Sequence, residues 1–356
     1  MVCCVMYFAF PVMHWSNTIG LLYCRGIVMK SSPSIGIVSW DFDPPHGGLG
    51  WVMQEIVRVL RDSGAQSQSF VSQNQSRIRF LQSVFTGLQQ WIDRHTLDTV
   101  LFPTGPGGIF LLRKPKRCRT IVVCYHSYVQ QCRSVPYQGW KWLFVPLEKR
   151  TLFFADRVFC YCENTRQVLE EEYGLTNVTL LPQILDVHVW KTQRTQKTQR
   201  TQRYCLYVGR KDRRKGYHIL QKAWNRVQKQ HPDVALCCVT SGQMSQDELV
   251  TSIQESELVI VPSYLEGFSL VAAQAMLAGK TVVASDVDGL RSLICHNETG
   301  WLVPPGDATV LANAICMLLT KQDLCKRLGD HAQKDLCMRF DRQSAVERFM
   351  VECLAT

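Results

Sequence analysis

The chain has 356 residues, of which 46% are hydrophobic and 20% are charged. This balance excludes an intrinsically disordered protein, and the length accommodates two domains with well-buried cores. The formal net charge is +10, but five basic residues and no acid lie in one tract at 191–203, which leaves 35 basic against 30 acidic residues elsewhere. Because this tract has no interleaved aromatic residues, no nucleic-acid partner is predicted.

The start of the chain differs from the rest. Residues 1–30 are predicted to be an N-terminal extension outside the fold, since Met1–Val28 has no basic leader and its apolar run is too short to span a bilayer. A membrane-tethering segment is the alternative. The sixteen cysteines are scattered, with no C-x-x-C pair and no zinc spacing. We therefore expect a reduced, cytoplasmic protein, with the inner face of a membrane as the alternative location.

Short apolar runs alternate with helical patterns between residues 31 and 188. Strands are predicted at Ile35–Trp40, Thr99–Phe102, Thr120–Cys124 and Arg157–Cys160, with a helix at Trp51–Leu60. This alternation predicts an α/β domain in which helices cover a parallel sheet.

Residues 191–203 form a basic three-residue repeat without apolar positions, so a solvated linker is predicted at 189–203. The α/β pattern then restarts over 204–338, and a closing helix is predicted within 339–356. The expected elements of the second half are strands at Tyr204–Val208, Val234–Thr240, Leu258–Val261 and Thr281–Ala284, and a helix at Tyr217–Val227. Two doubly wound, Rossmann-like domains that face each other across a cleft would direct the carboxyl ends of both sheets towards that cleft, where ligands bind.

Two glycine-containing loops follow predicted strands. His46–Gly50 reads HGGLG, and Gly48 would let the backbone approach a ligand while nearby N–H groups receive phosphate. A tight strand-to-helix connection is the alternative, and the absence of G-x-G-x-x-G argues against a dinucleotide site. Val208–Gly216 reads VGRKDRRKG, where Arg210 supplies a planar fork for phosphate oxygens and Lys215 a mobile charge.

Glu266 begins the most informative segment of the chain. A carboxylate, a glycine turn and a helix start follow the apolar run Leu258–Ser263, and such a helix start attracts phosphate groups. Gln274 lies eight residues after Glu266, about two helical turns along the same face. The candidate ligand-binding residues here are Glu266, Gly267, Phe268, Ser269, Leu270 and Gln274. His126 directly follows the strand Ile121–Tyr125, and an ordinary structural histidine is its alternative interpretation.

In this order the segments resemble the retaining glycosyltransferases of the GT-B fold, family 4, from about residue 34 to the C-terminus. The pattern G-R-x-x-x-x-K-G at 209–216 matches that family, and Glu266 with Gln274 corresponds to its E-x7-E signature with glutamine as the second residue. The resemblance implies that Glu266 lies by the donor sugar and that Gln274 contacts the nucleotide ribose. It also implies that Arg210 and Lys215 hold the donor diphosphate and that His126 hydrogen-bonds the sugar.

The resemblance further implies transfer of a hexose from a UDP- or GDP-sugar to a hydroxyl acceptor, such as a glycan or a lipid-linked sugar. Catalytic roles are expected for Glu266 and His126, and donor contacts for Gly48 and for the 267–270 backbone. No cofactor and no metal are expected, although Asp41–Asp43 and Asp286–Asp288 each read D-x-D. A catalytically weak sugar-nucleotide-binding protein and a GT-B epimerase stay open as alternatives.

Two further segments match the family's layout. Thr299–Asp307 is predicted to form a strand and a turn, with Asp307 capping the next helix. Tyr137–Phe154 combines aromatic and basic residues and is predicted to be a core helix that is broken or kinked at Pro146. A peripheral membrane surface, completed by basic residues near Lys114, is the alternative. Leu290–Arg291 stands where relatives carry Pro-Glu, and the closing helix is expected to cross back to the first domain.

Overall fold

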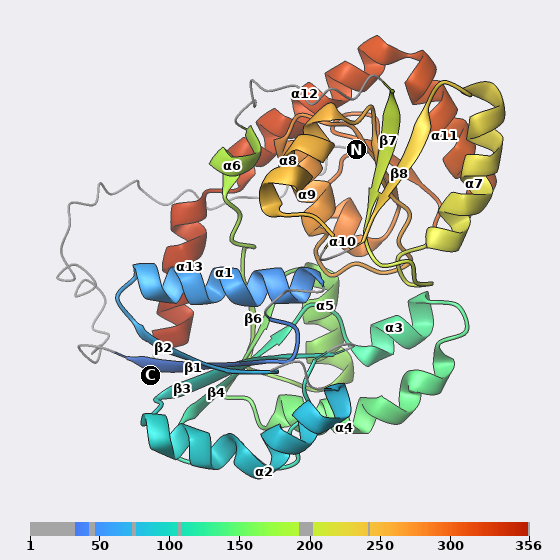
Figure 1. The fold of residues 1–356 in the computed structure, drawn as a ribbon. Coiled ribbons are helices and arrows are strands. Elements are labelled where there is room, and N and C mark those ends of the chain that lie inside the picture. Colours follow the sequence, from blue (N-terminus) through green and yellow to red (C-terminus); the bar gives the residue numbers. More distant parts are fainter. Residues whose placement is uncertain are drawn as a thin grey trace.

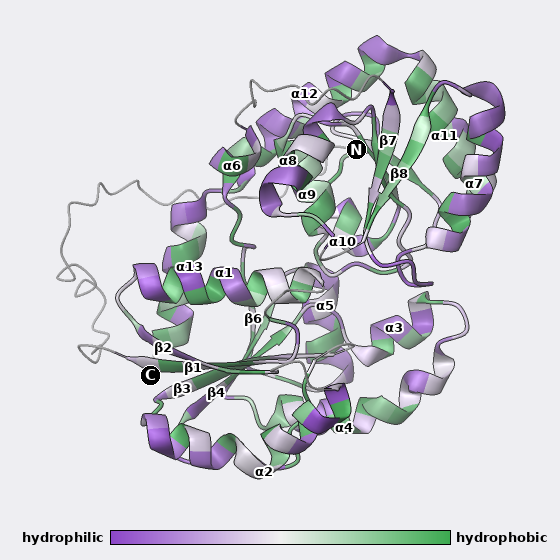
Figure 2. Cartoon of the chain, viewed as in Figure 1, coloured by the Kyte–Doolittle hydropathy of each residue, from purple (hydrophilic) through white to green (hydrophobic). Residues whose placement is uncertain are grey.

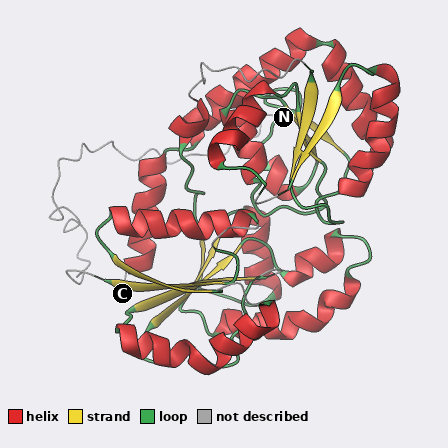
Figure 3. Ribbon diagram, in the orientation of Figure 1, coloured by secondary structure: helices red, strands yellow, loops and turns green. Residues whose placement is uncertain are grey.

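The computed structural model describes residues 33–42, 47–72, 76–105, 108–191, 202–240 and 243–354. The chain forms two α/β units, each built on a sheet of parallel strands, and the units lie one above the other (Figures 1 and 3). Helices cover each sheet. The predicted fold class is confirmed. The predicted extension at 1–30, His46, Asp43 and most of the basic tract lie outside the described residues.

The N-terminal unit contains a six-stranded parallel sheet in the order β2-β1-β3-β4-β5-β6. Its strands are β1 (Ser34–Ser39), β2 (Gln66–Val71), β3 (Thr99–Thr104), β4 (Arg119–Cys124), β5 (Arg157–Cys160) and β6 (Val178–Leu180). Its helices are α1 (Gly48–Asp62), α2 (Arg77–His95), α3 (Tyr128–Ser134), the 3₁₀ helix η2 (Gly139–Phe144), α4 (Val145–Phe153), α5 (Glu163–Gln167) and the π-helical turn η3 (Val168–Glu172).

The C-terminal unit contains a five-stranded parallel sheet in the order β11-β10-β9-β7-β8. Its strands are β7 (Tyr204–Val208), β8 (Ala235–Val239), β9 (Val259–Val261), β10 (Val282–Ser285) and β11 (Trp301–Val303). The remaining helices are α6 (Val187–Lys191), α7 (Tyr217–Gln230), α8 (Gln246–Glu255), α9 (Leu270–Leu277), α10 (Asp288–Arg291), α11 (Ala308–Thr320), α12 (Gln322–Arg339) and α13 (Arg342–Leu354).

The central strands are buried on both faces, which is why their sequences read as continuous apolar runs. The covering helices alternate between hydrophobic and hydrophilic positions (Figure 2). In α1 the buried side chains include Val52, Met53, Ile56 and Leu60, spaced by the helical period. Asp307 caps α11 by accepting hydrogen bonds from the backbone N–H groups of Thr309 and Val310, as predicted.

The last helix lies against the N-terminal sheet although it follows the C-terminal unit in sequence (Figure 1). The Phe349 ring meets Phe159 of β5 edge to face, with 6.0 Å between ring centroids. The Arg119 guanidinium donates to the Cys353 carbonyl, and Arg342 pairs with Glu55 of α1 at 2.7 Å. These contacts tie the helix that ends the described chain to the N-terminal unit.

Three sequence-based boundaries differ from the structure. The first helix begins at Gly48, three residues before the predicted start, because the glycines themselves form its first turn. The linker predicted at 189–203 begins later, since α6 extends to Lys191 and Trp190 is buried. The predicted core helix, broken or kinked at Pro146, is divided at Val145 into the 3₁₀ helix η2 and α4, and Pro146 lies in the first turn of α4. The break is thus found one residue earlier than predicted, but η2 contains no buried residue and does not belong to the core.

Candidate functional site

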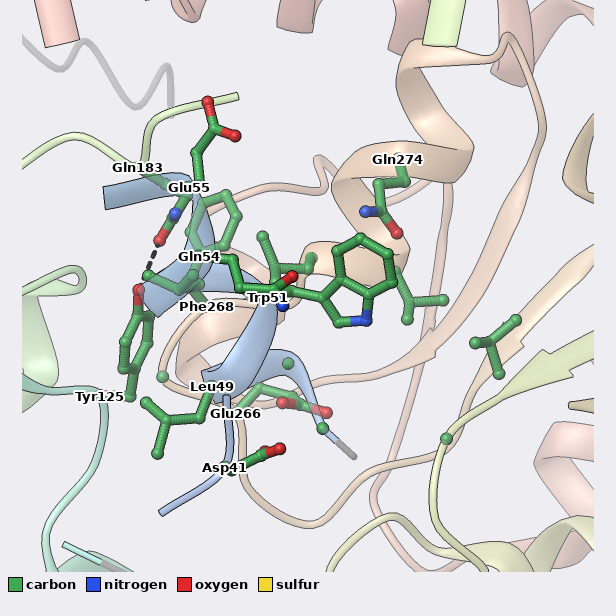
Figure 4. A pocket seen from close by; sticks show the side chains of 18 of the residues that line it. Asp41, Leu49, Trp51, Gln54, Glu55, Tyr125, Gln183, Glu266, Phe268 and Gln274 are labelled. Carbon is green, nitrogen blue, oxygen red and sulfur yellow. Dashed lines mark hydrogen bonds between the residues drawn. The ribbon is translucent and has the colours of Figure 1, made fainter. Parts of the chain in front are cut away.

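A cavity of about 310 Å³ lies between the two units. The segments that follow β1, β3, β4 and β6 form its N-terminal wall, and those that follow β7, β8 and β9 form its C-terminal wall. Both sheets therefore direct their carboxyl ends at one space, the usual position for a ligand in doubly wound folds. Figure 4 shows side chains from α1, the β4 loop and the α9 region around this space.

A buried carboxylate lies at the centre of the C-terminal wall. The Glu266 side chain is 5% exposed, and its Oε1 lies 2.7 Å from the Lys215 ammonium nitrogen. Its Oε2 lies 3.6 Å from an Arg214 guanidinium nitrogen, and the Ser263 hydroxyl donates to Oε1 at 2.7 Å. Two cations and a hydroxyl thus compensate one buried negative charge.

This cluster changes the acidity of its members. Burial alone raises the pKa of Glu266, but the charges of Lys215 and Arg214 outweigh it and lower this pKa to about 2. Burial, with a contribution from Arg214, lowers the pKa of Lys215 against the pull of Glu266. Near neutral pH the carboxylate is therefore fully ionised and held in place.

Three glycines fix the backbone that carries Glu266. A Cβ atom at Gly267 would lie 1.7 Å from the Tyr125 carbonyl oxygen of the opposite unit. A Cβ at Gly289 would lie 2.2 Å from the Glu266 carbonyl oxygen, and one at Gly216 would lie 1.8 Å from the Pro262 oxygen. Backbone approaches this close are possible only for glycine. The loop is therefore clamped from its own unit and from the facing one.

His126 reaches the cavity from the loop after β4. The residue as a whole is half-buried, yet both ring nitrogens are fully buried and have no hydrogen-bond partner within the described chain. Burial, reinforced by the Arg214 charge, lowers the pKa of His126 to about 3. The ring is therefore neutral near pH 7 and offers one donor and one acceptor to a ligand.

Helix α9 points its N-terminus at the cavity, and Ser269 caps it by accepting from the Ala272 N–H. Leu270 and Gln274 lie along the side of α9 that lines the cavity. Figure 4 shows Trp51 of α1 and Gln274 facing the same part of the space. The Phe268 ring is buried and packs edge to face on Phe340, with 5.8 Å between centroids, which anchors the turn before α9.

Arg210 and Gly48 complete the predicted set at the cavity wall. The Arg210 side chain is 57% exposed and pairs with Asp212 at 3.2 Å, so it is a mobile cation at the rim. A Cβ at Gly48 would lie 3.6 Å from Leu270, which places the glycine turn opposite the start of α9. The structure thus brings all ten predicted residues to one region: Gly48, His126, Arg210, Lys215, Glu266, Gly267, Phe268, Leu270 and Gln274 line the cavity, and Ser269 caps the adjoining helix.

Sequence reasoning missed Arg214 and the aromatic part of the wall. Arg214 is only 12% exposed, it donates to the Leu265 carbonyl at 3.0 Å, and it faces both Glu266 and His126. It stands at a variable position of the G-R-x-x-x-x-K-G pattern, where only its charge could have signalled a role. Trp40 and Trp51 line the N-terminal wall, but tryptophans beside a glycine turn carry no spacing signal of their own.

The acidic residues of the two D-x-D patterns lie at different places in the structure. Asp286 and Asp288 both pair with Arg291, at 2.8 and 3.1 Å, on the exposed surface around α10. Asp41 lines the cavity, and its Oδ2 lies 3.1 Å from the position of a Cβ at Gly47. Within the described residues, no cluster of three or more histidine, cysteine, aspartate or glutamate side chains has metal-binding geometry.

Two family models match the chain, one in each unit. The model described as Glycosyltransferase Family 4 matches residues 46–189, and the model described as Glycosyl transferases group 1 matches residues 238–335. Each range contains part of the cavity wall, including His126 in the first and Glu266 in the second, and together the two ranges span more than half of the chain.

Curated relatives match with moderate identity. Glycogen synthase of Mycobacterium tuberculosis is 26% identical over 194 residues, which cover 48% of this chain and 47% of that protein. D-inositol 3-phosphate glycosyltransferase of Pseudarthrobacter chlorophenolicus is 30% identical over 202 residues, which cover 47% of this chain and 48% of that protein. The chain thus spans about half the length of the curated relatives it matches.

Solved structures share the fold over most of the chain. Sucrose-phosphate synthase from Thermosynechococcus elongatus superposes with a TM-score of 0.74 at 20% identity, covering 89% of this chain and 97% of that one. The Anabaena protein HepE in complex with UDP-glucose superposes with a TM-score of 0.65 at 16% identity, covering 89% and 98%. At these identities the likeness concerns the arrangement of both units.

Proposed function

Since the chain belongs to the GT-B glycosyltransferases of family 4, group 1, we propose that it transfers a hexose from a nucleotide-diphosphate sugar to a hydroxyl acceptor, with retention of configuration. The observation that carries the proposal is the buried cluster of Glu266, Lys215 and Arg214, which faces the unpartnered His126 ring at the carboxyl ends of both sheets. Relatives with UDP and UDP-glucose bound support a UDP-sugar as the first donor to test.

The sugar of the donor is proposed to lie between Glu266 and His126. A neutral imidazole with two free nitrogens can donate to one sugar hydroxyl and accept from another, and burial of both nitrogens makes an unoccupied state costly. The fixed carboxylate of Glu266 then supplies a charged acceptor on the opposite side. These groups are proposed to orient the sugar, and the proposed mechanism uses no protein nucleophile.

The diphosphate is proposed to bind Arg210, Arg214, Lys215 and the start of α9. The backbone N–H groups of Leu270 and Val271 have no acceptor within the described chain, and the helix dipole adds positive potential there. Negative charge grows on the diphosphate as the bond to the sugar breaks, so groups already arranged around it lower the barrier. A metal-independent mechanism is proposed, in which these three cations compensate the charge of the leaving diphosphate.

The reaction is proposed to occur on one face of the sugar. The bond between the anomeric carbon and the leaving phosphate oxygen breaks, and a bond from that carbon to the acceptor oxygen forms. The acceptor hydroxyl proton passes to the leaving diphosphate, so no protein base is required. A glycan or a lipid-linked sugar is the proposed acceptor, and the wall of Trp40, Trp51 and Gln54 would receive it.

No helix among the described residues is long and apolar enough to cross a membrane. The chain is proposed to act in the cytoplasm, with peripheral contact to a membrane where the acceptor is lipid-linked.

A panel of labelled UDP-, GDP- and ADP-sugars tests the proposal by the release of nucleoside diphosphate and by transfer to mixed glycan and lipid acceptors. We expect turnover with at least one donor and a loss of at least 100-fold in Glu266→Gln. Glu298→Gln serves as the matched control, because Glu298 is exposed on the same unit and lies outside the cavity wall.

A thermal-shift series with UDP, GDP and ADP separates binding from chemistry. Stabilisation by one nucleotide without any turnover would overturn the transferase proposal and favour a binding protein, for which the neutral Gln274 is the specific motivation. Absence of any shift at millimolar nucleotide would overturn the donor-site assignment itself.

A further inference from the structure

Exposed hydrophobic side chains are concentrated on one side of the N-terminal unit. Of the twelve large hydrophobic residues that are exposed in the described chain, nine lie on α2, the 110–117 loop, η2 and α4 or the turn just before η2. These nine are Ile78, Phe85, Leu112, Tyr137, Trp140, Trp142, Leu143, Leu147 and Phe153. We call these elements together the aromatic face.

The elements of the aromatic face adjoin one another. The Leu111 N–H donates to the Thr151 hydroxyl of α4 at 2.9 Å, and the Gln89 amide of α2 donates to the Lys116 carbonyl at 3.2 Å. The Phe110 ring stacks on Phe144 of η2, with 6.0 Å between centroids. The loop 110–117 therefore joins α2 to η2 and α4, and Figure 1 shows α2 and α4 on the same side of the sheet.

The exposure of this segment is unusual for a water-facing surface. Leu143 is 77% exposed and Trp140 60% exposed, and η2 contains no buried residue at all. Contiguous apolar patches of this kind mark a surface that another body covers.

The charges on the aromatic face are mainly basic. Segments 110–117 and 137–154 contain seven basic residues and a single acid, Glu148 of α4, whose side chain is fully buried. Helix α2 adds Arg77, Arg79 and Arg94 and one exposed acid, Asp93. The Lys141 and Lys149 ammonium groups lie over the Trp140 and Phe153 rings, each at 5.7 Å. Within these two segments as the structure describes them, Lys114 alone forms an ion pair, with Asp156 at 2.6 Å.

We propose that the aromatic face docks on an anionic lipid bilayer surface. Tryptophan and leucine side chains enter the boundary between headgroups and acyl chains, while lysine and arginine remain at the phosphates. The excess of basic residues matches the negative surface potential of an anionic leaflet, which attracts lysine and arginine side chains near its surface. This charge together with exposed tryptophan and leucine side chains favours a bilayer as the occupant.

The aromatic face adjoins a loop that forms part of the cavity wall. The Arg213 guanidinium lies over the Tyr137 ring at 4.8 Å, so the start of the face touches the 208–216 loop, which carries Arg214 and Lys215. Docking therefore places this loop near the bilayer. The acceptor is accordingly inferred to be lipid-linked and to enter from the bilayer side, a step that rests on the proposed function, whereas docking itself does not.

Flotation of the full chain with vesicles tests docking. Vesicles of phosphatidylcholine alone are compared with vesicles that contain about one third phosphatidylglycerol, at low and high salt. We expect binding only to the anionic vesicles, weakened by salt. The double variant Trp142→Ser/Leu143→Ser and the charge variant Lys149→Glu/Arg150→Glu should each reduce the partition coefficient at least tenfold.

Met338→Ser on α12 and Lys334→Glu are the matched controls, because both residues are exposed on the C-terminal unit. They should leave binding unchanged. Absence of binding to anionic vesicles, or equal binding by the aromatic-face variants, would overturn the proposal. Sedimentation velocity completes the test: a dimer that the Trp142→Ser/Leu143→Ser variant converts to a monomer would assign the face to a second copy instead.

Donor hydrolysis measured in the same variants, without lipid, keeps the two proposals apart. None of the substituted residues lines the cavity, so hydrolysis should be unchanged. A protein that binds vesicles but turns over no donor would contradict the proposed function and leave docking intact. The converse result would contradict docking alone.

Discussion

Replacing Glu266 by glutamine tests whether the carboxylate is held as the structure indicates. The ionised side chain is stabilised by Lys215 at 2.7 Å and by Ser263 at 2.7 Å, and its pKa falls from 4.5 to about 2. A depression of this size corresponds to about 3 kcal/mol of folding free energy, since one unit is worth about 1.4 kcal/mol. The amide removes this contribution and leaves the Lys215 ammonium buried without its partner.

The sign of the pH dependence follows from the depressed pKa. The contribution of Glu266 is present above pH 4.5 and is lost as the pH falls through about 2. The melting temperature of the Glu266→Gln protein should therefore lie about 4 °C below that of the wild type at pH 7, since an unfolding entropy of about 2.1 cal/mol/K per residue amounts to roughly 0.75 kcal/mol/K for 356 residues. At pH 3 less than half of the free-energy difference should remain.

Differential scanning calorimetry between pH 3 and pH 7 provides the measurement, and a double-mutant cycle with Lys215→Met isolates the pair. We expect Lys215→Met to be much less harmful in the Glu266→Gln background, with a coupling energy of about 2 to 3 kcal/mol. Additive effects of the two substitutions, or a melting difference that does not change with pH, would refute the assignment of a buried ion pair.

Three further predictions concern single positions. Gly267→Ala should abolish transferase activity but leave the affinity for free nucleotide nearly unchanged, because the new Cβ would lie 1.7 Å from the Tyr125 carbonyl oxygen and push the two units apart. In the control Gly87→Ala on α2, the new Cβ meets nothing within 4 Å, so turnover should be unchanged. Gln274→Glu should lower the KM for the donor about 3- to 30-fold by offering a charged acceptor to a ribose hydroxyl, and an unchanged KM would remove Gln274 from the donor site. Burial raises the pKa of Glu148 to about 7, so the contribution of this group to stability should fall as the pH rises from 4.5 to 7. In denaturant titrations the free-energy difference between the wild type and Glu148→Gln should therefore change across this range, and parallel curves would contradict the prediction.

The sequence predicted the buried strands well, and it failed where burial is incomplete. The predicted strand Tyr204–Val208 matches β7 residue for residue, since a strand buried on both faces reads as one apolar run. Gln66–Val71 reads QSQSFV and gave no strand signal. This strand lies at the edge of the sheet beside β1, where one side faces solvent. It can therefore form without a run of apolar residues and without an alternating apolar and polar pattern.

The sequence predicted which residues belong to the candidate site, but it did not predict which of them contact each other. A strand, a turn and a helix start place Glu266 and Lys215 at the carboxyl ends of β9 and β7, which spacing alone indicates. Their direct ion pair depends on how β7 and β9 lie side by side in the sheet, which no motif encodes. The same holds for Arg214, whose neighbours are set by the 262–267 loop, and for η2, whose exposed aromatic residues read as core in the sequence.

The ion pair also indicates how the donor could organise the cleft. Lys215 bonds to Glu266 in the structure, while a diphosphate would compete for the same ammonium group. Transfer of Lys215 from Glu266 to phosphate frees Glu266 Oε1 for a sugar hydroxyl at the moment when the sugar arrives, and Arg214 and Ser263 still compensate the carboxylate. Because leaving Glu266 without its buried cation costs free energy, a nucleoside diphosphate that lacks the sugar should gain less from this exchange than the complete donor does. The arrangement therefore favours binding of the whole nucleotide sugar over its product.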